Sequence, residues 1–272
     1  RVTVRRTLGS DINASCGQLK RSKCKEEVNG LEGIRRKWYR KCRAENQDNF
    51  AYGNISDNIT WALVCDGMGG GKAGKVASSL LVEYIREIME KLNSNSEELK
   101  DIPKFLYNSI NNANLYIFNK SRENEDYNGM GTTVVLAIVL SEKIYTLHVG
   151  DSRAYLIKNK KIDQITVDHS IVQEMVDMGE ITLQEAMVHP RKNIITKAVG
   201  IKETVEPDFS ENPFERGSIL LMCTDGLTNH LDNEEILNIS LGSENEEIVA
   251  KLISGAKTLG GKDNITVLAV FN

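Results

Sequence analysis

Four aspartates stand at the ends of apolar runs, and this feature most constrains what the chain can fold into. Asp66 and Asp225 directly follow runs of buried-strand length, and Asp151 follows a third run. Asp263 comes just before the last run. A carboxylate at the mouth of a buried strand loses hydration unless it is paired or bound to a cation, so converging strand ends would form a hard-metal site. Each aspartate taken alone is more typical of a turn.

The expected ligands are oxygens, because cysteine and histidine form no metal-binding pattern. The five cysteines are irregularly spaced without a CxxC motif, and the four histidines are scattered. Oxygen ligands favour Mg²⁺ or Mn²⁺ over zinc. Two such cations about 3.5 to 4 Å apart can activate a shared water and neutralise phosphoryl oxygens, so the pattern indicates phosphate ester hydrolysis.

Composition places the chain among ordinary globular proteins. It has 272 residues, 40% of them hydrophobic, and only 4 prolines, enough for a substantial core in one large domain or two small ones. No apolar run reaches transmembrane length and no secretory signal is visible, so we expect a cytoplasmic protein without a membrane segment.

The charge is unevenly distributed along the chain. Residues 1–43 carry 13 Lys/Arg and 4 Asp/Glu, although the whole chain has a net charge of −4. A basic head of this kind could contact nucleic acid, but it contains few aromatic residues. A solvated basic extension is the simpler interpretation, and we expect no nucleic-acid partner.

Hydrophobic periodicity predicts strands and helices in blocks. Strands are expected over residues 59–65, 132–140, 143–149, 153–158, 161–165, 218–223 and 264–271, and helices over 76–92, 104–119, 170–178, 183–187, 234–239 and 246–259. Short turns separate the strands after residue 131, which is typical of antiparallel hairpins. This order predicts an α+β layered domain built on antiparallel sheets, not a doubly wound fold.

A glycine-rich turn offers a competing interpretation. Residues 69–75, Gly-Gly-Gly-Lys-Ala-Gly-Lys, satisfy the first seven positions of the phosphate-binding loop GxxxxGK[ST]. Val76 occupies the eighth position and lacks the hydroxyl that ligates magnesium in nucleotide triphosphatases. A phosphate-loop ATPase is therefore the weaker alternative.

Six short motifs occur in the order typical of the PP2C-type metal-dependent protein serine/threonine phosphatases, and the bacterial branch fits best. They are Arg43-Ala44-Glu45-Asn46-Gln47-Asp48, Asp66-Gly67-Met68-Gly69-Gly70, Gly131-Thr132-Thr133, Val149-Gly150-Asp151-Ser152-Arg153, Thr224-Asp225-Gly226-Leu227 and Lys262-Asp263-Asn264-Ile265-Thr266. Residues 168–200 resemble the flap and the adjoining segment of that branch. The resemblance covers residues 43–272 and implies a four-layer α-β-β-α sandwich of two antiparallel sheets.

The resemblance also implies a catalytic centre with two or three Mn²⁺ or Mg²⁺ ions. In this centre Asp66 bridges two ions, Gly67 contributes its carbonyl, and Asp225 and Asp263 complete the ligand set. Asp151 helps to hold a third, weaker ion. The implied nucleophile is a metal-bridged hydroxide.

Residues behind and beside the ligands follow from the same motifs. Arg43 resembles the arginine that grips the substrate phosphate, a role suited to its planar fork, although it could be one more charge of the basic head. Asp48, Gln47 and Asn264 would support the metal ligands from behind. Gln47 stands where the family usually has Glu, which predicts weaker metal binding. Met68 stands where animal members have a histidine.

The N-terminal region departs from the family pattern. Residues 1–13 resemble the first strand of the family, so residues 14–42 would be an atypical basic insertion within a single domain over residues 1–272. The insertion could be a regulatory or docking element or an inert surface loop.

We therefore predict a cytoplasmic signalling enzyme that hydrolyses phosphoserine and phosphothreonine in proteins. Its partners would be phosphoproteins, including a Ser/Thr kinase. The alternative from another class is a pseudophosphatase that acts as a binding or sensing module. The intact Asp66, Asp225 and Asp263 argue against that alternative, whereas Gln47 favours it.

Overall fold

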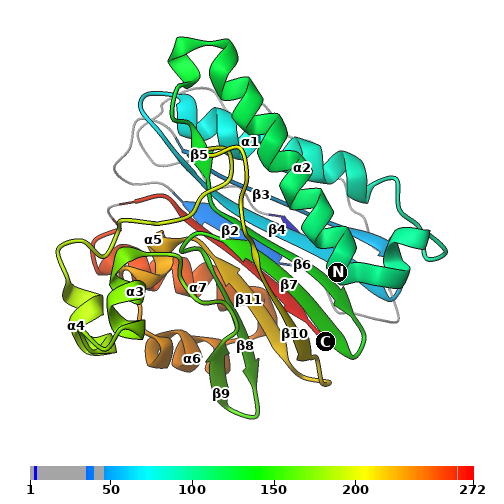
Figure 1. Ribbon diagram of the computed structural model, residues 1–272. Helices are drawn as coiled ribbons and strands as arrows, with labels where there is room; N and C mark the ends of the chain where they lie inside the picture. Colours follow the sequence, from blue (N-terminus) through cyan, green and yellow to red (C-terminus); the bar gives the residue numbers. More distant parts are fainter. Residues whose placement is uncertain (1–2, 5–34, 40–45, 262) are drawn as a thin grey trace, which may run out of the picture.

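Two β-sheets lie face to face, and helices cover the outer face of each one (Figure 1). The computed structural model describes residues 3–4, 35–39, 46–261 and 263–272. The predicted four-layer α-β-β-α architecture is confirmed. Within these described ranges, no helix combines the length and apolar character needed to cross a bilayer.

The first sheet has the strand order β1-β2-β12-β11-β8-β9. Its strands are β1 (Thr3–Val4), β2 (Arg35–Tyr39), β12 (Ile265–Phe271), β11 (Ile219–Cys223), β8 (Arg153–Lys158) and β9 (Lys161–Gln164). Neighbouring strands are antiparallel except for β1 and β2, which are parallel. The helices on this side are α5 (Asp225–Thr228), α6 (Asn233–Leu241) and α7 (Asn245–Thr258).

The second sheet has the order β10-β7-β6-β4-β3, and β5 pairs with the end of β4. Its strands are β10 (Asp208–Pro213), β7 (Lys143–Val149), β6 (Val134–Leu140), β4 (Ile59–Met68), β3 (Asp48–Ser56) and β5 (Gly131–Thr132). The helices α1 (Ala73–Met89) and α2 (Ile102–Glu123) cover it, and short 3₁₀ turns at Glu97–Asp101 and Glu125–Tyr127 flank α2. Two further helices, α3 (Ile171–Asp177) and α4 (Leu183–Val188), form the flap, which spans residues 168–200.

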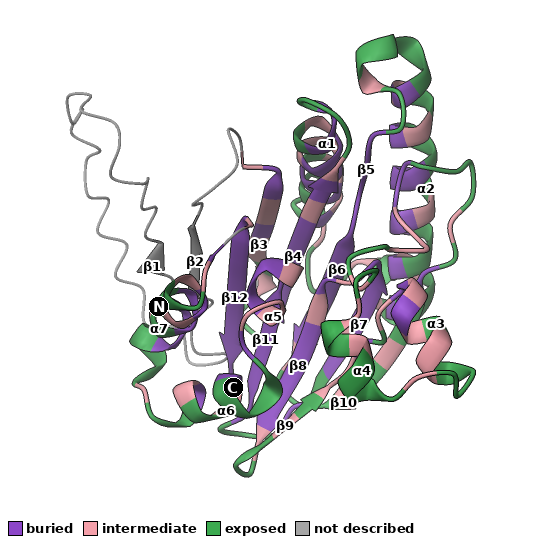
Figure 2. Cartoon of the chain, turned by 90° about the vertical axis from the view of Figure 1, so that its left-hand side faces the viewer, coloured by how far each residue is buried: buried purple, intermediate pink, exposed green. Residues whose placement is uncertain are grey.

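Alternating side chains on the central strands build separate apolar layers. On β4, Trp61, Leu63 and Cys65 pack in the layer with α1 and α2, whereas Ala62 and Val64 pack between the two sheets. Successive residues of a strand point to opposite faces, so a strand in a middle layer needs apolar residues throughout. Figure 2 shows the resulting continuous burial along the central strands.

The two edge strands of the second sheet, β3 and β10, were not predicted. Their sequences are Asp-Asn-Phe-Ala-Tyr-Gly-Asn-Ile-Ser and Asp-Phe-Ser-Glu-Asn-Pro, in which no apolar run is longer than three residues. Each pairs with one neighbour in this sheet, β3 with β4 and β10 with β7. Their strand conformation depends on these tertiary hydrogen bonds, which local composition does not encode.

The predicted insertion over residues 14–42 contains a strand of the first sheet. Arg35–Tyr39, inside this span, forms β2 and pairs with both β1 and β12. These five residues belong to the sheet because β12 supplies the hydrogen-bonding edge, although three of them are basic. The rest of the span and most of the first strand predicted over residues 1–13 lie outside the described residues.

The junction between β4 and α1 leaves no room for a side chain at Gly74, where a Cβ atom would lie 2.6 Å from the Gly67 carbonyl oxygen. We expect Gly74→Ala to lower the free energy of unfolding by about 1–3 kcal/mol through overpacking, despite the better helix propensity of alanine. Gly70→Ala is the matched control, because a Cβ there has no neighbour within 4 Å. Denaturant unfolding of both variants tests this, and equal stability would contradict the packing argument.

Candidate functional site

The two sheets are joined by hydrogen bonds at the end where the acidic residues gather. Asp48 begins β3 and lies opposite Asp66 of β4 in the strand register. The hydroxyls of Thr224 and Thr266, which come from the other sheet, donate to Asp48 Oδ2 at 2.9 and 2.8 Å. Asp48 therefore fixes the strand ends of one sheet against those of the other.

The Asp48 carboxyl is in an unfavourable position for an anion. Its pKa is raised to about 7 by the balance of three effects. Burial raises the pKa most, the two threonine hydroxyls lower it, and the negative charges of Asp225 and Asp263 raise it. Its second oxygen, Oδ1, is buried and accepts no hydrogen bond within the described part of the chain. A buried carboxylate oxygen of this kind is suited to a water or hydroxyl ligand of a cation.

Asp66 is held through its backbone, which leaves its carboxylate available. Its N–H donates to Thr133 Oγ1 at 2.9 Å, and its carbonyl accepts from the Thr132 hydroxyl at 3.0 Å. Burial holds the pKa of Asp66 well above its usual range, and the charges of Asp48 and Asp225 add to this, as do those of two further aspartates. The strand ends thus bring the predicted ligands close enough to repel each other.

The residues predicted to support the ligands contact one another. Gln47 donates its backbone N–H to Asn264 Oδ1 at 2.9 Å and accepts from the Gly67 N–H at 3.1 Å. The Gln47 amide also donates to the Gly71 carbonyl at 3.1 Å, a bond that an ionised Glu could not make. Asp263 Oδ1 accepts from the Asn264 N–H at 2.7 Å, which orients that carboxylate.

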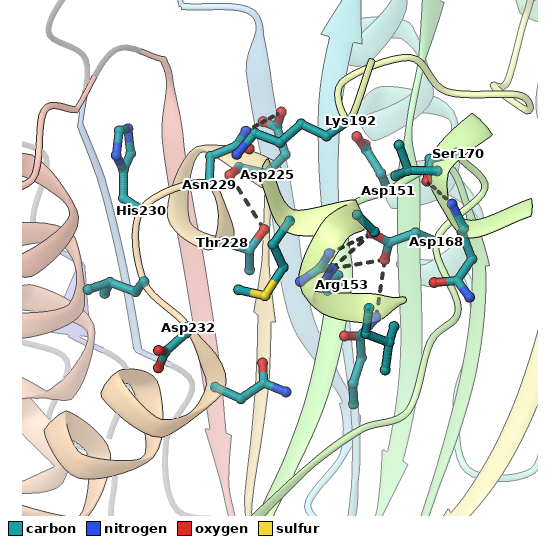
Figure 3. A pocket seen from close by; sticks show the side chains of 18 of the residues that line it. Asp151, Arg153, Asp168, Ser170, Lys192, Asp225, Thr228, Asn229, His230 and Asp232 are labelled. Atoms are coloured by element: carbon teal, nitrogen blue, oxygen red, sulfur yellow. Dashed lines mark hydrogen bonds and ion pairs between the residues drawn. The ribbon is translucent and has the colours of Figure 1, made fainter. Parts of the chain in front are cut away.

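Asp225 and Asp151 approach the same region from two other segments, and both line one recess (Figure 3). Asp225 is the first residue of α5, and Asn229 donates its amide to Asp225 Oδ2 at 2.9 Å. Burial raises the pKa of Asp151 to about 8, and the charges of Asp225 and Asp168 contribute to this increase.

The donor set fits divalent cations with a preference for oxygen. The negative charges of the four predicted aspartates repel one another or repel Asp48; these are Asp66, Asp151, Asp225 and Asp263. Each of these side chains offers only carboxylate oxygens as ligands. A cation among them would offset both the repulsion and the desolvation. The predicted phosphate-binding Arg43 lies outside the described residues.

A second cluster was not predicted and does not have the geometry of a metal site. The rings of His148 and His169 are stacked with centroids 4.9 Å apart and an interplanar angle of 11°. Ring nitrogens bind metals in the plane of the ring, so two stacked, nearly parallel rings do not converge on one ion. Lys197 already lies 3.4 Å from Asp208 Oδ1, which in turn lies 3.3 Å from His169 Nε2.

This cluster instead braces the loop that carries Asp151. The ring nitrogen Nδ1 of His169 accepts a hydrogen bond from the backbone N–H of Gly150 at 3.1 Å. The backbone N–H of His169 donates in return to the Gly150 carbonyl at 2.9 Å. Gly150 has a φ of +105°, and a Cβ there would lie 2.6 Å from the Thr133 side chain. These contacts give His169 a structural role beside the proposed metal centre.

A recess of about 650 Å³ opens beside the aspartates, between the flap and the helices α5 and α6 (Figure 3). Its floor contains the ion pair of Arg153 and Asp168, with Arg153 Nη2 2.7 Å from Asp168 Oδ2. Sequence reasoning missed this pair and the threonines that bond to Asp48. The motifs that contain Arg153, Thr224 and Thr266 were visible as Gly-Asp-Ser-Arg, Thr-Asp-Gly and Asp-Asn-Ile-Thr. The partners of these residues are not part of the same motifs.

Comparisons with known proteins support the predicted family. A family model described as "Protein phosphatase 2C" matches residues 40–253. The serine/threonine phosphatase stp of Listeria monocytogenes serotype 4b (strain F2365) is 39% identical over 231 residues, which cover 85% of this chain and 91% of that protein.

Solved structures agree with these sequence matches. The crystal structure of the serine/threonine phosphatase Stp1 from Staphylococcus aureus superimposes with a TM-score of 0.83 at 34% identity, covering 89% of this chain and 95% of that one. The catalytic domain of the serine/threonine protein phosphatase PstP, in complex with 2 manganese ions, gives a TM-score of 0.76 at 30% identity, with coverages of 88% and 98%.

The raised pKa of Asp48 predicts a pH dependence of stability in the presence of a chelator. The folded-state pKa of about 7 exceeds the ordinary value of 3.8, so the folded chain keeps a proton that the unfolded chain has lost. The free energy of unfolding of the wild type, minus that of Asp48→Asn, should therefore fall as pH rises from about 4 to about 7. Denaturant unfolding of both proteins across this range measures the difference. A difference that stays constant or grows with pH would contradict the assignment.

Proposed function

The chain belongs to the protein phosphatase 2C family and is a protein serine/threonine phosphatase, and we propose that Asp66, Asp225 and Asp263 hold the two divalent cations on which its activity depends. The observation that supports this most strongly is the convergence of these carboxylates at the joined ends of the two sheets. The two manganese ions of the related PstP catalytic domain support the proposed number.

The cations would supply the main chemical activation when they are bound. Paired cations lower the pKa of a water that they share and neutralise charge on the phosphoryl oxygens of the substrate. Asp66 would bridge the pair, and Gly67 would contribute its carbonyl oxygen. Asp151 would help to hold a third cation, because its carboxylate faces the same recess as Asp225. Mn²⁺ and Mg²⁺ both suit these oxygen ligands.

The remaining residues would position the ligands and the substrate. Asp48 holds two threonine hydroxyls through Oδ2, and its buried Oδ1 would accept a hydrogen bond from a cation-bound water. Asn229 orients Asp225 by its amide hydrogen bond. Arg43 would bind the substrate phosphate with its bidentate guanidinium. Met68 offers no proton, so we propose that the leaving oxygen takes its proton from water.

The two alternatives have less support. A phosphate-loop ATPase requires a parallel βαβ unit around its glycine-rich turn, whereas β4 is antiparallel to both of its neighbours, β3 and β6. A pseudophosphatase would not need to keep four aspartates in mutual repulsion at one end of the sandwich.

We further propose a biological setting for this activity. Phosphoproteins are the substrates, and a Ser/Thr kinase would be the natural opposing partner in cytoplasmic signalling. The whole chain would form one domain, and residues 14–42 would be a basic insertion in it, of which Arg35–Tyr39 pairs with the first sheet. None of these proposals alters the chemistry of the centre.

The test is turnover of a phosphothreonine peptide with and without Mn²⁺. Asp225→Asn keeps the shape of the side chain and its place at the start of α5 but removes a charged ligand. We expect kcat/KM to fall by at least about 100-fold, because a lost ligand should cost no less than the 10- to 100-fold typical of an outer-sphere partner.

Asp57→Asn is the matched control, since it changes an exposed aspartate in the turn between β3 and β4, outside the proposed ligand set and outside the recess. Calorimetric titration with Mn²⁺ should show weaker binding by Asp225→Asn alone. Turnover that needs neither Mn²⁺ nor Asp225 would contradict the proposed function.

A further inference from the structure

The recess beside the aspartates has walls of different chemistry. One wall comes from the flap helix α4 and its surroundings, and the opposite wall comes from the segment that leads into α6. Because Asp225 and Asp151 line its inner end, a protein substrate whose phosphate lies at the proposed cations would place neighbouring residues in or beside this recess.

The flap wall is apolar and exposed. Leu183 and Met187 of α4 line the recess with side chains that are 62% and 56% exposed, and Ala186 lies between them. Val188 continues the exposed apolar surface at the end of the same helix. Exposed apolar residues grouped beside a cavity indicate a binding surface, whereas scattered ones do not.

The opposite wall is acidic. Asp232, Glu234 and Glu235 all line the recess and are exposed. Asp232 and Glu235 form a capping box at the start of α6, in which each side chain accepts from the backbone N–H of the other. Within the described residues, the Glu234 side chain has no hydrogen-bond or ion-pair partner.

The other charges of the recess do not balance this wall. Arg153 is neutralised by Asp168 in the floor, through three short contacts between the guanidinium and the carboxylate. Among the described residues that line the recess, Lys192 of the flap is then a single cation against the three carboxylates of the acidic wall. This described part of the lining therefore carries a negative charge in addition to that of the proposed metal ligands.

One kind of side chain matches both walls. Lysine and arginine have long aliphatic stems that pack on apolar surfaces and cationic heads that remain solvated or paired. We propose that this recess is a specificity site that binds a Lys or Arg side chain within four residues of the phosphorylated residue. The stem would pack on Leu183 and Met187, and the cation would face Glu234. This inference rests on the proposed function, because it assumes that the phosphate is bound at the aspartates.

The experiment compares phosphothreonine peptides that differ at one position at a time, from four residues before to four residues after the phosphothreonine. Arg, norleucine and Glu are placed at each position, and kcat and KM are measured with Mn²⁺-loaded full-length enzyme. We expect one position at which the Arg peptide has a kcat/KM about 3- to 10-fold above that of the Glu peptide. The difference should lie in KM and not in kcat, because the contact is remote from the reacting atoms.

Charge reversal tests whether Glu234 binds the cationic side chain of the substrate. Glu234→Lys should abolish or invert the Arg-over-Glu preference, whereas Glu83→Lys, on the exposed face of α1 away from the recess, should leave it intact. Leu183→Asn should lower the affinity for the Arg and norleucine peptides alike. The Arg preference should weaken with added salt, as expected for exposed charges.

The outcomes separate this inference from the proposed function. p-Nitrophenyl phosphate carries no flanking residues, so its Mn²⁺-dependent turnover reports the metal centre alone. Turnover of this substrate together with equal kcat/KM for all peptides would overturn the specificity site and leave the phosphatase centre intact. A preference that survives Glu234→Lys would also overturn it. Absence of turnover with every substrate would overturn both proposals.

Discussion

Electrostatic repulsion among buried carboxylates is the constraint on which the rest of this structure depends. The pKa values of Asp48, Asp66 and Asp151 are all raised, first by burial and then by the charges of neighbouring aspartates. A fold gains nothing in stability from such an arrangement by itself. The arrangement becomes favourable when divalent cations bind, so the strained region of the fold is also its proposed catalytic centre.

The sandwich holds these carboxylates in place by linking its two sheets at one end. The apolar layers fix the distance between the sheets, and the threonine hydroxyls that bond to Asp48 fix their ends. The close approach of Gly67 to α1 and of Gly150 to Thr133 allows the neighbouring aspartates to reach the same region. The flap then adds a wall to the recess without contributing to the apolar core between the sheets.

The elements that could be predicted from the sequence are those with a clear local pattern of apolar residues. The apolar runs of β4, β6, β11 and β12 and the periodic helices α1 and α7 were placed within a few residues. The edge strands β3 and β10 were missed, because their polar sequences become strands only through pairing with a neighbour. The predicted aspartates were brought together, but the hydroxyl partners of Asp48 lie 176 and 218 residues away from it in sequence. The recess and the pair of stacked histidines are likewise products of distant contacts.

We propose that divalent cations relieve the repulsion within this cluster of aspartates. The most direct measurement is differential scanning calorimetry of the full chain in a chelator and in saturating Mn²⁺, beside the Asp66→Asn variant. A cation that binds only the folded chain raises Tm. We expect the Tm of the wild type to rise with Mn²⁺ and that of Asp66→Asn to rise much less. A wild-type Tm that does not respond to Mn²⁺ would contradict it.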